Sequence, residues 1–286
     1  MTGSRRLRFG FSPCPNDTFA FWAAVHGKGA AGRHGIELVP VMDDIEGLNE
    51  RAVRGTDPLE LTKLSMPALA ACARTHVALS AGAALGHGVG PLVVVRDDST
   101  VQELASLRGM RVAVPGANTT ALLLLRLALG GTCTLVPMRF ERIMPAVARG
   151  ECDAGLVIHE SRFTHASHGL RSVADLGTWW EGATGLPIPL AVIAARRDLG
   201  GATVEALAAM LRESVQHAFA HPADTRAFVR AHSQELSDEV CDRHIALYVN
   251  RFSIDLGDEG RAAVRELLAR GRAAGLLPGG TDPFAP

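Results

Sequence analysis

Short apolar runs alternate with amphipathic stretches through the first third of the chain, which predicts strands and helices in turn. We expect strands at 7–11, 36–41, 59–63 and 77–80, and helices at 17–26, 45–54 and 66–74. The helix at 45–54 runs up to Gly55, a residue type that commonly closes helices. Strands that alternate with helices are typical of a parallel sheet covered by helices.

A second series of the same kind occupies the middle of the chain. We expect strands at 111–114, 135–140 and 154–158, and helices at 119–129 and 143–149. Apolar segments at 92–95 and 187–194 bound this series and indicate two crossings between lobes. The pattern predicts a two-lobed α/β fold with a mostly parallel sheet in each lobe. Lobe 2 (93–192) is inserted into lobe 1 (1–92 plus 193–286), and the ligand cleft lies between them, where strands end.

The last third of the chain has the spacing of helices. They are expected at 204–220, 223–231, 238–250 and 259–273. Their apolar faces could complete the first lobe, cover the cleft or pair two subunits, so a homodimer is one of three open interpretations.

Composition narrows the partners and the location. The chain has 286 residues, 47% of them hydrophobic, and a net charge of −1, which argues against nucleic acid and membrane surfaces as partners. No apolar run approaches the roughly 20 residues that cross a bilayer, and no signal-peptide pattern follows the first arginines. The five cysteines are far apart and lack CxxC spacing, which predicts reduced thiols in a cytoplasmic protein without a zinc site.

The turn after the first strand is the first candidate binding element. Two prolines, Pro13 and Pro15, fix the backbone, and Asn16 and Asp17 are residue types that cap helices. A rigid strand-to-helix turn presents backbone N–H groups and the positive end of a helix dipole to an anion. We therefore expect Asn16, Asp17 and Thr18 to contact a small acidic ligand.

Two further strand-to-helix junctions carry polar groups. Thr119 and Thr120 open the helix at 119–129, and their hydroxyls with the first N–H groups could hold a carboxylate or phosphate, or simply cap the helix. Lys63, Leu64 and Ser65 end a strand and enter a helix, which brings Lys63 to the cleft, although most lysines are solvated.

His159 is the candidate base. It ends the buried strand at 154–158, so it should stand in the cleft, and an imidazole takes protons near neutral pH without a metal. Glu160 could orient His159 or be solvated, and Arg162 could pair with an anion or form a surface salt bridge. The Trp179-Trp180 pair could pack in the core or stack on a ligand.

The absence of other motifs limits the chemistry. No GxSxG, HExxH or GxGxxG motif occurs in a suitable context, so a serine triad, metal-assisted hydrolysis and hydride transfer lose support. We expect no cofactor and no metal.

Taken together, these residues resemble the 1,4-dihydroxy-6-naphthoate synthase family of the futalosine route to menaquinone. The matching segments, in chain order, are SPCPNDTFAF at 12–21, LTKLS at 61–65, GVGPLVV at 88–94, VAVPGANTTA at 112–121, VIHESRF at 157–163, SDEV at 237–240 and YVNRFSIDLG at 248–257.

The resemblance implies a fold like that of type II periplasmic binding proteins, in a cytoplasmic enzyme without cofactor or metal. It implies a carbon–carbon lyase that converts cyclic dehypoxanthinylfutalosine, an aromatic carboxylate with a sugar-derived ring, to 1,4-dihydroxy-6-naphthoate, with dihydroxyacetone as the co-product. The family's histidine base falls on His159, and its site-lining segments fall on Lys63-Leu64-Ser65 and Thr119-Thr120.

Three alternatives stay open at this point. A chorismate dehydratase of the same pathway would also use a carboxylate-holding cleft, but the segments at 12–19 and 158–163 argue against it. A non-catalytic solute-binding protein of the same fold would need an export signal. The effector-binding lobe of a transcription regulator would need a DNA-binding element, for which no pattern is seen.

Overall fold

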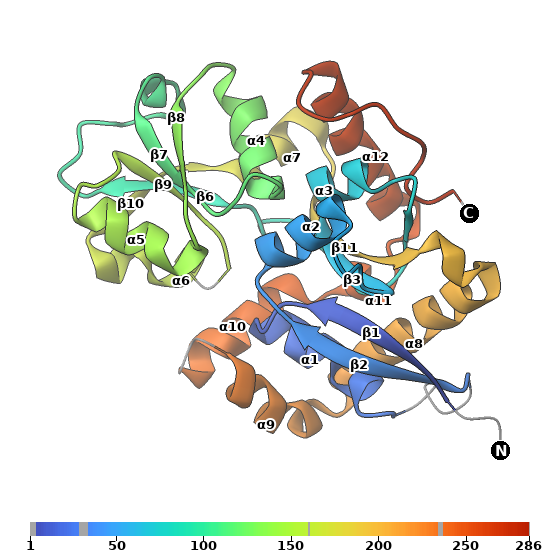
Figure 1. Cartoon of the computed structure of the whole chain (residues 1–286). Coiled ribbons are helices and arrows are strands. Elements are labelled where there is room, and N and C mark those ends of the chain that lie inside the picture. The colour runs from blue at the N-terminus through green and yellow to red at the C-terminus, as the bar shows by residue number, and fades with distance from the viewer. Residues whose placement is uncertain (1–3, 29–33, 160, 234–236, 286) are drawn as a thin grey trace.

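Two β-sheets with helices packed on them make up the molecule (Figure 1). The structure is a computed structural model that describes residues 4–28, 34–159, 161–233 and 237–285. We call the first sheet with its helices the first lobe, and the second sheet with its helices the second lobe.

The first sheet has the strand order β2-β1-β3-β11-β4, and β5 also pairs with β11. Its strands are β1 (Arg5–Phe11), β2 (Ile36–Met42), β3 (Leu61–Ser65), β4 (His76–Ala78), β5 (Ala84–Gly86) and β11 (Ile188–Arg196). The second sheet has the order β10-β6-β9-β7-β8. Its strands are β6 (Leu92–Arg96), β7 (Arg111–Val114), β8 (Thr134–Pro137), β9 (Ala154–Val157) and β10 (Leu170–Asp175).

Helices separate the strands in both lobes. Between the strands lie α1 (Pro15–Val25), α2 (Ile45–Arg54), α3 (Met66–Ala71), α4 (Thr120–Leu129), α5 (Phe140–Ala148), α6 (Ser161–Thr164) and α7 (Leu176–Thr184). After β11 the chain is helical, with α8 (Gly201–Ala220), α9 (Pro222–His232), α10 (Asp238–Tyr248), α11 (Arg251–Ile254) and α12 (Gly257–Ala273). Helices α8, α9 and α10 pack on α1, so most of the C-terminal third completes the first lobe.

The two-lobed α/β fold predicted from the sequence is confirmed, and its sheets are mixed. β1 pairs in parallel with β2 and β3, and β7 with β8 and β9. The crossing strands β6 and β11 run antiparallel to their neighbours. The sequence analysis expected mostly parallel sheets. The antiparallel pairs arise because β6 and β11 enter a sheet from the other lobe, whereas parallel neighbours require a helical crossover. All strands of the second sheet come from Leu92–Asp175, and the lobe boundaries at 92/93 and 192/193 stay a prediction.

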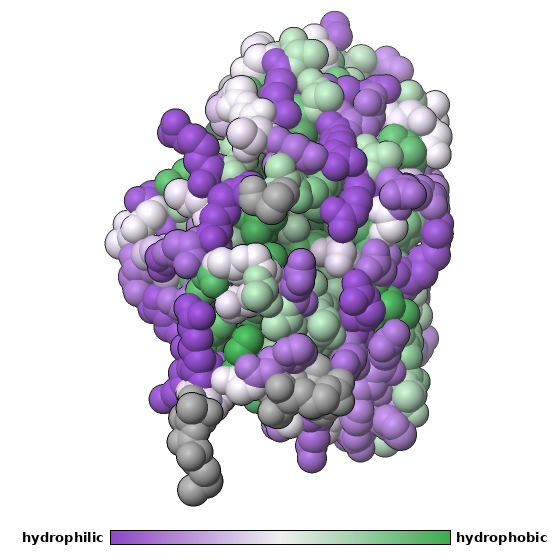
Figure 2. Space-filling view, turned by 90° about the vertical axis from the view of Figure 1, so that its right-hand side faces the viewer, coloured by the Kyte–Doolittle hydropathy of each residue, from purple (hydrophilic) through white to green (hydrophobic). Residues whose placement is uncertain are grey.

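The cores show what holds the lobes together. In the first lobe Phe9, Phe11 and Phe21 form a buried aromatic cluster with ring centroids 4.9 to 5.4 Å apart. A larger apolar cluster runs from β3 through β6, β7 and α4 to α12, and so joins the two lobes. Complete burial of a side chain as large as Leu or Phe stabilises the folded state by about 1.5–3 kcal/mol. On the face shown in Figure 2, hydrophilic residues surround small apolar areas. None of the described helices has both the length and the apolar character that a membrane crossing requires.

Candidate active site

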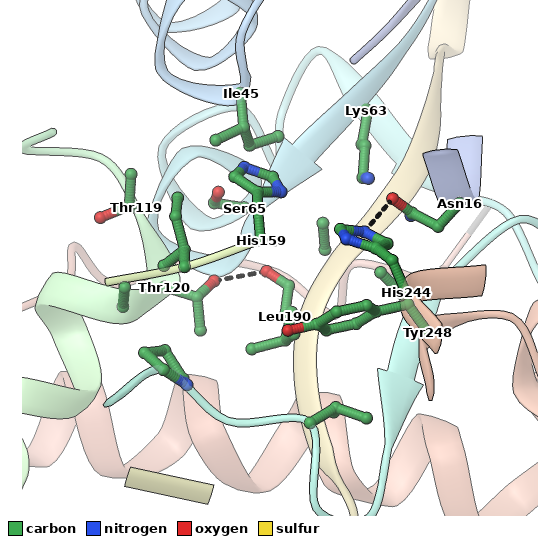
Figure 3. A pocket seen from close by; sticks show the side chains of 16 residues that line it. Asn16, Ile45, Lys63, Ser65, Thr119, Thr120, His159, Leu190, His244 and Tyr248 are labelled. Carbon is green, nitrogen blue, oxygen red and sulfur yellow. Dashed lines mark hydrogen bonds between the residues drawn. The ribbon is translucent and has the colours of Figure 1, made fainter. Parts of the chain in front are cut away.

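A cavity with about 580 Å³ of empty space lies between the lobes. Its polar lining residues are Asn16, Lys63, Ser65, Thr119, Thr120, His159, His244 and Tyr248, and its apolar ones are Ile45, Ala84, Val89, Pro91, Ala121, Ile158, Leu190 and Ala191 (Figure 3). Both lobes contribute, and the apolar half of the lining suits the flat face of an aromatic ring.

His159 stands at the carboxyl end of β9, as predicted. Its backbone has a φ of 57°, in the left-handed region that residues other than glycine seldom adopt and that is often found at functional sites. Its Nδ1 atom lies 3.4 Å from the Sγ atom of Cys14, and its ring centroid lies 5.0 Å from that of Phe140. Burial, with a smaller contribution from the charge of Lys63, lowers the pKa of His159 to about 3. The imidazole is therefore neutral at physiological pH and able to accept a proton.

Lys63 and Asp17 form a buried ion pair beside the cavity. Lys63 Nζ donates to both carboxylate oxygens of Asp17, at 2.6 and 2.7 Å. Asp17 also accepts from the backbone N–H of Ser12, at 3.0 Å, and from Asn16 Nδ2, at 2.7 Å. The expectation that Lys63 reaches the cleft fits this geometry, but its charge is balanced by Asp17. Asp17 itself fixes the turn and does not line the cavity.

The turn at Asn16 also holds a histidine that the sequence analysis did not select. His244 on α10 is fully buried, and its Nε2 atom lies 2.9 Å from Asn16 Oδ1. Its ring is nearly parallel to that of His159, with an angle of 9° and centroids 6.4 Å apart. Burial lowers the pKa of His244 well below the usual value, so this imidazole is neutral too. One feature of the sequence pointed to His244: it lies between the family-matching segments at 237–240 and 248–257.

The two threonines at the start of α4 have structural partners. Thr119 Oγ1 accepts from the N–H of Leu122 at 3.3 Å and donates to the carbonyl of Gly116 at 3.0 Å, so it caps the helix. Thr120 Oγ1 donates to the carbonyl of Leu190 at 2.6 Å and accepts from the N–H of Met66 at 2.9 Å. Both residues line the cavity, and the helix start between them offers backbone N–H groups and a positive dipole end to an anion.

Of the remaining predicted binding residues, Ser65 lines the cavity and two others do not. Ser65 Oγ accepts from Asn49 Nδ2 at 3.0 Å, so its O–H group can donate to a bound anion. Leu64 is fully buried in the apolar core that joins the lobes. Thr18 donates its hydroxyl to the carbonyl of Cys14 at 3.0 Å and so stabilises the first turn of α1. Leu64 and Thr18 thus support the cavity wall and do not line the cavity.

The sequence analysis left two interpretations each for Arg162, Glu160 and the Trp179-Trp180 pair. Arg162 donates to Asp175 at 2.6 Å and to the carbonyl of Gly90 at 2.5 Å, so it ties α6 to the end of β10 and to the segment that leads into β6. Trp180 is fully buried and donates to the carbonyl of Pro187 at 3.0 Å, which supports the core interpretation of the tryptophan pair. Glu160 lies outside the described residues.

A second cavity, with about 610 Å³ of empty space, also reaches His159. It is more polar, and its lining includes Ser12, Cys14, Asp43, Asp44 and Arg139. Arg139 belongs to the second lobe and lies 3.9 Å from Asp44 of the first. His159 therefore stands where an apolar and a polar cavity meet.

A further hydrogen-bonded contact joins the lobes next to the site. Glu46 at the start of α2 accepts from the backbone N–H and from the side-chain amide of Asn118, both at 3.0 Å. Burial raises the pKa of Glu46, although these hydrogen bonds act in the opposite sense. Asn118 directly precedes the threonines of α4, so this contact sets the position of α4 against the first lobe.

Among the residues that the structure describes, no group of three or more His, Cys, Asp or Glu side chains is arranged to hold a metal ion.

Two relatives resemble this chain over nearly its whole length. One from Thermus thermophilus is 53% identical over 278 residues, which cover 97% of this chain and 98% of the relative. One from Streptomyces coelicolor is 45% identical over 289 residues, which cover 98% of each. Both are named 1,4-dihydroxy-6-naphthoate synthase.

Solved structures give the fold class. A protein from Archaeoglobus fulgidus superposes with a TM-score of 0.84 at 36% identity, covering 95% of this chain and 98% of that one. The periplasmic aliphatic sulphonate-binding protein of Escherichia coli superposes with a TM-score of 0.68 at 15% identity, covering 98% of this chain and 90% of that one. The latter likeness concerns the fold alone and confirms the predicted periplasmic-binding-protein-like architecture.

A family model described as menaquinone biosynthesis matches residues 7–273. Together with the two relatives, this match shows that the chain belongs to the menaquinone biosynthesis family.

Proposed function

We propose that this enzyme is a carbon–carbon lyase of the cytoplasm. It converts cyclic dehypoxanthinylfutalosine to 1,4-dihydroxy-6-naphthoate and releases dihydroxyacetone. The names of the two relatives and the seven matching segments support this substrate and product.

The observation that carries the proposal is the state of His159. A neutral imidazole with a low pKa stands at a strand end in a largely apolar cavity between the lobes. In this setting His159 takes a proton from a substrate carbon next to a carbonyl group, the sugar-derived ring opens, and the carbon–carbon bond breaks. Aromatisation of the remaining ring makes the product favourable, and a positioned base contributes roughly 10²–10⁴-fold to such a step.

The aromatic carboxylate binds at the start of α4. The backbone N–H groups there and the Ser65 hydroxyl are suited to an anion, whereas Lys63 is already neutralised by Asp17. The apolar side chains Ile45, Leu190 and Val89 contact the ring faces. No cofactor takes part in this scheme, because each step is a proton transfer or a bond cleavage within the substrate.

Two other functions fit the fold and are tested in the same experiment. The purified protein is incubated with cyclic dehypoxanthinylfutalosine and, in parallel, with chorismate. Naphthoate formation is followed by absorbance, and consumption of chorismate is followed by liquid chromatography. We expect 1,4-dihydroxy-6-naphthoate from the first substrate only. Turnover of chorismate would show a chorismate dehydratase, and tight binding of the cyclic substrate without product would show a solute-binding protein.

The His159→Ala variant tests the assigned base. It should bind 1,4-dihydroxy-6-naphthoate about as well as the unchanged protein and lose turnover by about 10²-fold or more. Normal turnover of this variant would refute the role of His159.

A further inference from the structure

His159 lies on a short connection between β9, which ends at Val157, and Arg162 on α6. We call residues 158, 159, 161 and 162 the His159 loop. The backbone of His159 has a φ of 57°, and a residue with a β-carbon keeps this conformation only where its surroundings hold it. The imidazole can therefore stay in the cavity only if both ends of the loop are fixed.

The second sheet fixes the start of the His159 loop. Val157 of β9 pairs with Leu92 of β6, and Leu92 pairs on its other side with Asp175, the last residue of β10. The three strands β10, β6 and β9 are neighbours in the sheet (Figure 1). The residue before the loop is thus held by an antiparallel ladder.

The guanidinium of Arg162 fixes the other end of the loop. Its Nη1 atom donates to the carbonyl of Gly90 at 2.5 Å, and its Nη2 atom donates to Asp175 Oδ2 at 2.6 Å. The backbone N–H of Arg162 donates to the carbonyl of His159 at 3.3 Å. Because a guanidinium is planar and offers several donors in a rigid fork, one side chain can hold two acceptors at once. Arg162 thereby ties the end of the loop to β10 and to the segment entering β6, beside the strand from which the loop starts.

Both acceptors of Arg162 are themselves held in place. Asp175 Oδ1 accepts from the N–H groups of Gly177, at 2.8 Å, and Thr178, at 3.2 Å, so this carboxylate also caps α7. Gly90 packs so closely on Gly177 that a Cβ atom on Gly90 would lie 2.1 Å from the Gly177 nitrogen. The side chains of Arg162 and Asp175 are 18% and 23% exposed, so water weakens this ion pair less than it weakens one at the surface.

We propose that Arg162 is a positioning residue that keeps His159 in its left-handed backbone conformation and its imidazole in the cavity. The inference rests on the proposed function, in which His159 is the base. Arg162 lines neither of the two cavities that reach His159, and its two terminal nitrogens already have protein acceptors. It therefore acts on the reaction through His159 rather than on the substrate. A base displaced by about 1 Å can lose about 10²-fold in rate.

Steady-state kinetics of two variants test the proposal. Arg162→Ala removes both donors, and Arg162→Lys keeps the positive charge beside Asp175 but lacks the planar fork. For cyclic dehypoxanthinylfutalosine we expect kcat to fall about 10²-fold in Arg162→Ala and less in Arg162→Lys, with KM within about threefold of the unchanged protein in both. A higher KM with an unchanged kcat would overturn the proposal in favour of substrate binding by Arg162. Unchanged kinetics of Arg162→Ala would overturn it as well.

Arg171→Ala is the matched control. Arg171 also belongs to the second lobe and donates to two carbonyls, of Ser99 at 2.8 Å and of Val101 at 2.6 Å, but its partners lie in the segment 99–101 and not beside the His159 loop. This variant should keep kcat and KM, and urea denaturation of both alanine variants measures what each loses in stability. An equal fall of kcat in Arg171→Ala and Arg162→Ala would show a general weakening of the lobe and overturn the positioning role.

A structural measurement separates this proposal from the proposed function. In crystal structures of Arg162→Ala and Arg162→Lys we expect the φ of His159 to leave the left-handed region and the distance from its Nδ1 atom to Cys14 Sγ to exceed 3.4 Å, at least in the alanine variant. An unchanged His159 in Arg162→Ala would overturn the positioning role, whatever the kinetics. Normal turnover by His159→Ala, or no naphthoate from the unchanged protein, would instead refute the proposed function, and the position of His159 in the variants would still decide the role of Arg162.

Discussion

Lys63 Nζ lies 2.6 and 2.7 Å from the two carboxylate oxygens of Asp17, and both side chains are almost completely buried. Breaking a buried pair leaves an uncompensated charge in a poorly solvated place, whereas removing both partners does not. The ion pair thus holds the turn that carries Asn16, at the wall of the cavity that contains His159.

The first prediction concerns this pair. Asp17→Asn should lower the free energy of unfolding by about 3–5 kcal/mol, because the Lys63 charge stays buried without its partner. Lys63→Met should have a similar cost. The double variant should lose clearly less than the sum of the two, as urea denaturation followed by circular dichroism will measure. Additive losses would contradict a direct interaction between the two side chains.

The second prediction concerns Thr120, whose hydroxyl accepts from the N–H of Met66 and donates to the carbonyl of Leu190. Thr120→Val removes the hydroxyl at nearly constant shape and leaves a buried N–H group and a partly buried carbonyl without this partner. It should cost about 1–3 kcal/mol of stability.

Thr120→Ser is the matched control, because it keeps the hydroxyl. It should stay close to the unchanged protein in urea denaturation. Equal losses in both variants would point to the methyl group rather than to the hydrogen bonds.

The sequence predicted the strand-to-helix junctions well because each has a local signal. Asp44 accepts from two N–H groups at the start of α2, and Gly55 ends that helix in the left-handed region, so both ends match the prediction of 45–54. His159 could be selected because a buried apolar run leads directly to it. Such signals depend on residues within a few positions of one another.

Contacts between residues far apart in the chain could not be predicted from the sequence. His244 lies within an ordinary amphipathic helix, and its partner Asn16 is 228 positions away. Lys63 was expected to line the substrate site, and nothing local in the sequence indicates that Asp17 neutralises its charge. β5 has three residues and pairs with β11, about a hundred positions later, so its strand character comes from that pairing rather than from a pattern of its own.

The third prediction concerns acid stability through His76, a residue outside the cavity. His76 on β4 is 2% exposed, and burial, assisted by the charge of Arg196, lowers its pKa to about 4. Between pH 6.5 and about 4 the unfolded chain binds a proton here that the folded chain does not, so stability falls as the pH falls. Proton uptake by His76 in the unfolded chain should by itself lower the free energy of unfolding by about 2 kcal/mol between pH 7 and pH 5.

His76→Leu removes the titrating group. The decrease in unfolding free energy between pH 7 and 5 should therefore be smaller in this variant than in the unchanged protein, by about the amount given above. Denaturation at both pH values in both proteins measures this difference, and the slopes due to other histidines cancel in the comparison. Equal pH dependence of the two proteins would show that His76 takes up a proton in the folded state.

The last prediction concerns the pH dependence of the reaction. An unperturbed imidazole base would give an acid limb in kcat/KM centred near pH 6.5. The pKa of His159 is lowered to about 3, so the base is neutral throughout the range from pH 5 to 7. The sign follows directly: lowering the pKa of a base widens its active range on the acid side. We expect kcat/KM for cyclic dehypoxanthinylfutalosine to change less than about twofold between pH 7 and 5, measured in a buffer that holds ionic strength constant. Denaturation at pH 5 has to be followed alongside, because His76 lowers stability there. A tenfold decrease with a midpoint near 6.5, in protein that is still folded, would show that the ring of His159 is solvated in the free enzyme and that the cavity between the lobes is open.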